Sequence, residues 1–183
     1  MRALPMTSQA PASTLATLDL LPYLDAAGEI PTTHQGRVGI YAIFDQAQVL
    51  QYVGYSRDVY QSLKQHLVRQ PHACHWYKVQ TIDRPSRTLL EGIRSAWITE
   101  NGTPPGNQDE AAWTAAIDAA ATMTPEEKAH YATLDELGQI KFLKNMARRL
   151  EGDIFAALEA RGVTMALRFN PKLKESGLLD LKS

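Results

Sequence analysis

The sequence predicts an α+β protein, in which a small module with a three-stranded antiparallel sheet flanked by helices precedes a mainly helical C-terminal region. Two observations lead to this fold class. Segments rich in Val, Ile, Tyr and Phe alternate with helical patterns in the order strand, strand, helix, strand, helix within about 70 residues, which is typical of a small α+β unit. After Asn107 the composition turns to alanine and acidic residues, with one long helical pattern.

The 183 residues divide into three parts. Residues 1–35 form an N-terminal tail and adapter, residues 36–107 form the α+β module, and residues 108–183 form the mainly helical region. We expect residues 1–12 to be a loose tail. We expect residues 15–30 to be a short acidic adapter, because prolines and a glycine in and beside this stretch leave little room for a long helix.

The first two strands are expected to form a hairpin. Residues 37–45 and 48–55 are rich in β-branched and aromatic residues, and a short polar break separates them. If residues 46–47 form the loop, the numbers of paired residues sum to 93, and Tyr41 lies directly opposite Tyr52. Cross-strand partners project from the same face, so this register places two phenols side by side, whereas a slip of one residue would separate them.

Two helices and a third strand complete the predicted module. Ser56 can cap a helix that runs to about Gln70, and Asp58 in its first turn favours the helix dipole. Residues 75–82 are predicted to form the third strand. Apolar residues at helical spacing predict the second helix over residues 86–101.

The C-terminal region is expected to be built around one long helix. The pattern predicts this helix over residues 135–161, closed by Gly162. Residues 163–169 are predicted to form one more strand. Three cations lie on one face of the long helix: Lys141, Lys144 and Arg148. A solvated surface is the plainer interpretation, and a surface that binds nucleic acid or a partner protein is the alternative.

Charge excludes one broad class of protein. Nineteen Lys and Arg residues against twenty Asp and Glu residues give a formal charge of −1, so the chain does not hold nucleic acid through overall positive charge. Residues 37–107 alone carry eight basic and five acidic residues, a net +3. Any site for a polyanion must therefore be local, and this stretch permits one.

The single cysteine and the absence of long apolar runs suggest a compartment. Cys74 cannot form an internal disulfide, which favours a reducing environment, and we expect the cytoplasm. No apolar segment is long enough for a membrane span or a secretory signal, so we expect no membrane association. His72 and His75 lie beside Cys74, but this spacing, without a second ligand pair elsewhere, is not that of a structural zinc site.

Two tripeptides carry the main functional signal. Gly39-Ile40-Tyr41 lies on the first predicted strand and Tyr52-Val53-Gly54 on the second, with ten residues between the tyrosines. His66 follows on the first predicted helix, Glu91 on the second, and Asn107 after the prolines. In these motifs and in their order, the module resembles the GIY-YIG nuclease superfamily.

The resemblance implies a metal-dependent endonuclease that hydrolyses phosphodiester bonds of DNA, or of RNA. It implies that Tyr41 and Tyr52 orient water and phosphate and that His66 acts near the water. It also implies that Glu91 holds Mg²⁺ or Mn²⁺, and Mg²⁺ commonly binds through only one or two carboxylates. Three residues would support this site: Gly39, Gly54 and Asn107.

The chain departs from the family at one position. The family's catalytic arginine stands ten residues after the second tyrosine, where this chain has Ser62. A preorganised donor of this kind contributes roughly 100- to 1000-fold to the rate of such reactions. Arg57 and Arg69 are the candidates for a replacement, with Arg87 and Arg94 beside the predicted metal ligand, and the sequence also allows that none of them fills the role.

Two other functions therefore stay open. One is a module with the same fold that is weak or inactive as a catalyst and binds nucleic acid or a protein through the same sheet face, which the serine at position 62 favours. The other is an adapter, whose helix over residues 135–161 binds a partner protein or a second copy of this chain.

Overall fold

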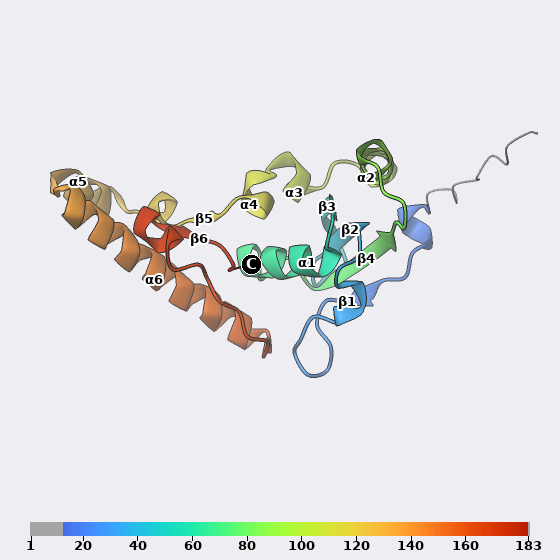
Figure 1. Ribbon diagram of the computed structural model, residues 1–183, viewed down its shortest axis with the longest axis horizontal. Helices are drawn as coiled ribbons and strands as arrows, with labels where there is room; N and C mark the ends of the chain where they lie inside the picture. Colours follow the sequence, from blue (N-terminus) through green and yellow to red (C-terminus); the bar gives the residue numbers. More distant parts are fainter. Residues whose placement is uncertain (1–12, 183) are drawn as a thin grey trace, which may run out of the picture.

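A computed structural model describes residues 13–182, and the predicted tail over residues 1–12 lies outside them. The described chain is elongated, with the sheet at one side and the pair of helices α5 and α6 at the other (Figure 1). The last described residues return to lie beside α1. None of the helices within these residues combines the length and hydropathy needed to cross a bilayer.

The central sheet has four strands rather than the three predicted. They are β1 (Leu21–Pro22), β2 (Gly39–Phe44), β3 (Leu50–Ser56) and β4 (Trp76–Thr81), in the order β1-β4-β2-β3, and every pairing is antiparallel. The missed strand, β1, is only two residues long and contains a proline. Proline cannot donate a ladder hydrogen bond, but it is tolerated because β1 is an edge strand.

The predicted hairpin register is wrong by two residues. Tyr41 pairs with Gly54, and Tyr52 pairs with Ile43, so the paired numbers sum to 95. The loop is longer than two residues because Gln48 adopts a left-handed conformation (φ 62°), and an irregularity follows Ile43. A shift of two residues keeps each side chain on its face, so the rings of Tyr41 and Tyr52 still lie together, with 6.3 Å between their centroids.

Helices α1 (Val59–Arg69) and α2 (Arg87–Asn101) cover opposite faces of this sheet. The alternation of side chains along β2 explains the arrangement: Tyr41 and Ile43 belong to the core beneath α1, whereas Ile40 belongs to the core beneath α2. The module is therefore a sheet between two helices.

The predicted N-cap of α1 is also wrong. The cap is Asp58, whose carboxylate accepts a hydrogen bond from the backbone N–H of Gln61 at 3.2 Å. Ser56 instead ends β3, and its hydroxyl accepts a hydrogen bond from the backbone N–H of Asp58. The N-cap of α2 is Ser86, whose hydroxyl accepts a hydrogen bond from the backbone N–H of Leu89.

The region after Asn107 is mainly helical, and its longest helix ends where predicted. The C-cap of α6 is Arg161, and Gly162 follows with a positive φ of 80°. The strand expected over residues 163–169 is wrong, because only an isolated bridge forms there, between Phe169 and Leu181. The elements of this region are α3 (Pro105–Gln108), α4 (Ala111–Thr114), β5 (Ile117–Asp118), α5 (Pro125–Thr133), α6 (Glu136–Ala160) and β6 (Leu178–Leu179). Four short 3₁₀ helices complete the elements of residues 13–182: Leu15–Thr17, Thr32–His34, Ala119–Thr122 and Leu173–Ser176.

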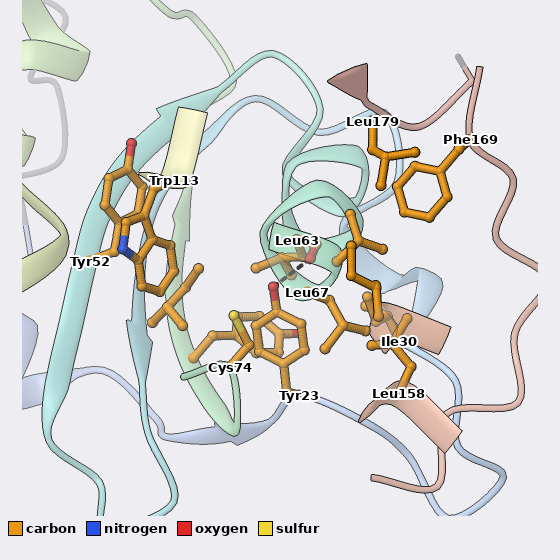
Figure 2. Packing of buried hydrophobic residues seen from close by; sticks show 14 of the residues in the cluster. Tyr23, Ile30, Tyr52, Leu63, Leu67, Cys74, Trp113, Leu158, Phe169 and Leu179 are labelled. Atoms are coloured by element: carbon orange, nitrogen blue, oxygen red, sulfur yellow. Dashed lines mark hydrogen bonds between the residues drawn. The ribbon is translucent and has the colours of Figure 1, made fainter. Parts of the chain in front are cut away.

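One hydrophobic core joins the module to the C-terminal region. Leu63 and Leu67 of α1 pack in the same cluster as Leu158 of α6 and Leu179 of β6 (Figure 2). Tyr23 of the N-terminal adapter lies in this cluster and donates a hydrogen bond to the backbone carbonyl of Leu63. The division of the chain at residues 35 and 107 stays a prediction, since this core crosses both positions.

Candidate functional site

The structure brings together three of the residues that the sequence singled out. Tyr41 comes from β2, Tyr52 from β3 and His66 from α1, and all three are at least 95% buried, with exposed fractions of 3%, 5% and 3%. The hydroxyl of Tyr41 lies 2.8 Å from Nε2 of His66. The ring of His66 lies 4.9 Å from that of Tyr52, measured between centroids. We call these three residues the tyrosine–histidine cluster.

Trp113 of α4 covers the cluster. Its ring stacks on Tyr52 with 5.0 Å between centroids and an interplanar angle of 5° (Figure 2), and it lies 5.5 Å from the ring of His66. The close approach of the chain before α4 needs a glycine, because a Cβ on Gly106 would lie 2.6 Å from Nε1 of Trp113. Sequence reasoning missed Trp113, although a tryptophan within an alanine-rich segment is a signal of burial.

Burial sets the protonation of the cluster. The pKa of His66 is lowered to about 3, first by burial and then by the guanidinium of Arg69, so the imidazole is neutral. Burial also raises the pKa of Tyr41, so its phenol keeps its proton. Among the described residues, Nδ1 of His66 has no hydrogen-bond partner. The cluster is therefore a neutral, enclosed set of aromatic groups.

The two arginines proposed as replacements for the missing cation occupy different places. Arg69 reaches the cluster's edge, but its guanidinium donates to the carbonyl of Trp113 at 3.0 Å and to Asp180 at 3.0 Å. Arg57 is exposed at the end of β3 and lines a separate groove. The hydroxyl of Ser62, at the position of the missing arginine, donates to the hydroxyl of Ser56 at 2.7 Å. Through its bonds to Trp113 and Asp180, Arg69 fixes α4 and the C-terminal segment to α1.

Three predicted supporting residues hold the strands and α3 in place. The side-chain amide of Asn107 accepts from the backbone N–H of Val53 at 2.7 Å and donates to the carbonyl of Val53 at 2.8 Å. A Cβ on Gly54 would lie 2.9 Å from the hydroxyl oxygen of Tyr41, and one on Gly39 would lie 2.7 Å from the carbonyl oxygen of Gln80. Both glycines are therefore required by close packing.

Glu91 lies outside the tyrosine–histidine cluster, on the exposed surface of α2. One of its oxygens accepts from the hydroxyl of Tyr55 at 3.1 Å and from Nε of Arg87 at 3.0 Å. These two hydrogen bonds, led by that of Arg87, lower the pKa of Glu91. Within residues 13–182 no group of three or more His, Cys, Asp or Glu side chains converges as a metal site, and Mg²⁺ at Glu91 stays a prediction.

A polar groove separates β3 from α2. Tyr52 and Glu91 both line it, whereas Tyr41 and His66 do not. Arg94 crosses the groove, since its guanidinium donates to the carbonyl of Val53 at 3.3 Å and pairs with Glu110. The lining residues of this polar groove are Tyr52, Gly54, Tyr55, Glu91, Arg94, Ser95 and Glu110.

A second groove adjoins the polar groove at Tyr55, and we call it the arginine groove. It has a volume of about 590 Å³ and lies between the end of β3 and the N-terminus of α2. Arg57 and Arg87 are its charged lining residues, and both are exposed. The first turn of α2 contains no acidic residue, so the positive end of the helix dipole faces this region unopposed. The complete lining is Val38, Tyr55, Ser56, Arg57, Pro85, Ser86, Arg87 and Leu90.

The single cysteine lies deep in the core. Cys74 has no exposed surface and lies beside Tyr23 in the hydrophobic cluster (Figure 2), and its thiol is 3.5 Å from the backbone carbonyl of His66. Burial raises the pKa of Cys74 to about 12. Thiol chemistry needs an accessible thiolate, and neither condition is met here.

Comparison with known proteins gives one informative similarity. No protein-family model matches the chain. A stretch of 99 residues, 51% of this chain, is 33% identical to the bifunctional monothiol glutaredoxin-S16 of the chloroplast of Arabidopsis thaliana. The match covers 32% of that relative, so this chain spans about a third of its length.

This comparison contradicts the predicted resemblance to the GIY-YIG nuclease superfamily. The relative bears the name of a redox protein, and neither that name nor any family model indicates a nuclease. The predicted family and the predicted function as an endonuclease, a hydrolase of phosphodiester bonds, are therefore corrected. The positions of the site residues do not depend on the family, and their catalytic roles stay untested predictions.

The relative's name does not transfer its redox activity to this chain. The relative is called bifunctional, and its name does not say which third of its length this chain matches. The thiol of Cys74 is enclosed and resists ionisation, so the chain presents no reactive thiol of its own. The name also places the relative in the chloroplast, and a cytoplasmic location for this chain stays a prediction.

Proposed function

We propose that the chain is a nucleic-acid-binding protein and that the arginine groove receives the phosphate backbone. The observation that carries this proposal is that two exposed arginines, Arg57 and Arg87, line the same groove. The N-terminus of α2 forms one side of this groove. Arginine binds phosphate through a planar fork of donors, and a helix N-terminus attracts anions through its free N–H groups.

The charge around the groove supports the same ligand. Arg37 and Arg84 are exposed and stand next in sequence to the lining residues Val38 and Pro85. Arg37 pairs with Asp83 at 3.2 Å, but both side chains are more than half exposed, and such pairs are weak in water. A stretch of the chain with a net charge of +3 thus places four arginines at one end of the sheet.

An aromatic side chain completes the proposed surface. Tyr55 lines both the arginine groove and the polar groove and is partly exposed. Its hydroxyl is held by Glu91, which fixes the direction of the ring. A fixed aromatic ring between cations is the usual platform for a base of a single strand. We therefore favour single-stranded nucleic acid over duplex.

The test is binding of a fluorescently labelled single-stranded oligonucleotide, measured by anisotropy over a series of salt concentrations in EDTA. For the wild-type chain we expect the affinity to fall linearly with salt on a log–log plot. The double variant Arg57→Ala/Arg87→Ala should lower the slope by about 1.4, because each phosphate contact contributes roughly 0.7 for single strands. The matched control is Lys141→Ala/Arg148→Ala, which removes two exposed cations from α6.

Two results would contradict this proposal. Binding that does not depend on salt, or a double variant that binds as the wild type does, would remove the arginine groove from consideration. The same mixtures are run on a denaturing gel after addition of Mg²⁺. Shortening of the probe would show that the protein cleaves the strand, whereas the proposal is of binding alone.

A further inference from the structure

A third groove lies beside α1, and the cations that line it come from three separate segments of the chain. It has a volume of about 500 Å³ and lies between the exposed face of α1 and the last residues of the chain. We call it the C-terminal groove. Its lining includes Gln61, Lys64, Leu167, Arg168, Leu181 and Lys182.

Backbone pairing places two of these cations opposite each other. Phe169 and Leu181 form an antiparallel bridge, and the backbone N–H of Lys182 donates to the carbonyl of Arg168 at 2.8 Å. Arg168 and Lys182 are therefore cross-strand partners, whose side chains project from the same face. Like charges directly opposite each other destabilise such a pair, and a bound anion would relieve this repulsion.

No acidic side chain within the described residues neutralises the groove. Neither Lys64, Arg168 nor Lys182 forms an ion pair within 4 Å in residues 13–182, and the lining contains no Asp or Glu. The nearest acid in sequence is Asp180, which is bound by Arg69 at 3.0 Å and accepts from the backbone N–H of Leu181. Its charge is compensated away from the groove.

The C-terminal groove lies on α1, and Arg57 of the arginine groove stands two residues before α1 begins at Val59. Asp180 meets Arg69 at the C-terminal end of this helix, whereas Lys182 lies with Gln61 and Lys64 nearer its N-terminal end. The last residues of the chain thus run along α1 toward Arg57. Lys64 is five residues beyond the start of α1, which corresponds to about 7.5 Å along the helix axis.

We propose that the C-terminal groove binds phosphate groups of the same nucleic-acid strand that occupies the arginine groove. This inference rests on the proposed function and extends it, since it makes the strand follow α1 and makes residues 166–182 part of the binding surface. Lys64, Arg168 and Lys182 contact phosphates. Leu167 and Leu181, which are partly buried, offer apolar contact to sugars or bases.

The test uses two labelled oligothymidylates of about 5 and about 20 nucleotides, within and beyond the length that one such surface holds. The triple variant Lys64→Ala/Arg168→Ala/Lys182→Ala should lower the salt slope for the long probe by about 2, and its affinity at low salt by tenfold or more. Binding of the short probe to the intact arginine groove should change less than twofold. The control variant is Lys128→Ala/Lys141→Ala/Arg148→Ala, with exposed cations from α5 and α6.

The outcomes separate this inference from the proposed function. If the triple variant binds the long probe with the wild-type slope while Arg57→Ala/Arg87→Ala lowers it, this inference is wrong and the proposed function stands. If the triple variant alone lowers the slope, the chain binds the strand without the arginine groove, so the binding site given in the proposed function and the path shared by the two grooves are both wrong. If neither variant has an effect, both are wrong as well. A thermal unfolding midpoint at or above that of the wild type shows that the triple variant is folded.

Discussion

Tyr52 and Tyr55 lie three residues apart on β3 and meet opposite environments. Tyr52 is 5% exposed, stacks on Trp113 and belongs to the tyrosine–histidine cluster, whereas Tyr55 is partly exposed between the polar groove and the arginine groove. Side chains alternate along a strand, so a spacing of three sends the two phenols to different faces. The tyrosine–histidine cluster is thus buried on one face of the sheet, and the exposed arginines that a ligand can reach lie near the other face.

The difference shows that the identity of a residue does not decide its role. Tyr41, Tyr52 and His66 form a dry and neutral group whose contacts are with one another and with Trp113. Arg87, by contrast, has a side chain that is 85% exposed. A large polyanion reaches Arg87 without any change in the fold, whereas Tyr41 and His66 are buried and line none of the three grooves.

The largest expected effect concerns the enclosed side of this comparison, at Cys74. Because its pKa is about 12, against about 8.5 for a free cysteine, the thiolate fraction in the folded state is lower by roughly three orders of magnitude. We expect the thiol to react with Ellman's reagent at least about a thousandfold more slowly in the folded protein than in denaturant. The single cysteine makes the assay unambiguous.

Fast reaction of Cys74 in the folded protein would break the comparison. It would mean that the core opens readily, and it would return the redox activity in the relative's name to consideration. Cys74→Ala, which should show no reaction in either condition, is the blank for this measurement.

A second large effect is expected when the cover of the cluster is removed. Trp113→Ala deletes a buried indole that stacks on Tyr52 and contacts His66, and substitutions of this kind cost about 3–5 kcal/mol. Urea denaturation should show this loss in the free energy of unfolding. Leu137→Ala is the control, because that side chain is 77% exposed and its truncation should change stability by less than about 0.5 kcal/mol. A loss below about 1 kcal/mol for Trp113→Ala would show that α4 is not firmly seated.

The limits of sequence reasoning follow from the same contrast. The strands β2 and β3 and the helices α1 and α2 were predictable, because local residue composition and periodicity mark them. The hairpin register was not, because it depends on the conformation of Gln48 in the loop. Strand β1 was not, because two residues with a proline carry no strand pattern.

The site was only partly predictable for a related reason. The prediction grouped Tyr41, Tyr52, His66 and Glu91 through the family resemblance. The structure brings the first three together and leaves Glu91 on the surface of α2. The sequence could not show that Trp113 covers them, because Trp113 lies 44 residues beyond Arg69, whose guanidinium binds the Trp113 carbonyl. The arginine groove depends likewise on two segments, at Arg57 and Arg87, whose proximity no local pattern shows.

The pH dependence of stability should report the neutral state of His66. Its pKa is about 3 in the folded state and about 6.5 when unfolded, so between these values the unfolded chain binds one more proton. Stability contributed by this group is present above pH 6.5 and falls as the pH decreases toward 3, by up to about 1.4 kcal/mol per pH unit. His66→Gln should reduce this slope in urea denaturation between pH 6 and pH 4.

An unchanged slope in His66→Gln would mean that His66 is protonated in the folded protein. The imidazole would then have access to water or to a partner for Nδ1, and the cluster would not be the enclosed group described above. The comparison between the two faces of β3 would lose its main support.

The smallest expected effect concerns the exposed side, at Glu91. Its carboxylate accepts hydrogen bonds from Arg87 and Tyr55, so Glu91→Gln removes a negative charge beside the arginine groove and frees Arg87 for phosphate. We expect the affinity for the short oligonucleotide to rise about two- to fivefold at low salt, and the salt slope to rise by up to about 0.7. Anisotropy titrations of both proteins, each in EDTA and in Mg²⁺, measure these changes. Glu100→Gln is the control, because that carboxylate binds the backbone N–H groups of Leu15 and Ala16 instead. Loss of binding in Glu91→Gln, restricted to the samples with Mg²⁺, would instead indicate that this carboxylate holds the ion, as the sequence predicted, and that Arg87 is not the group that meets the phosphate.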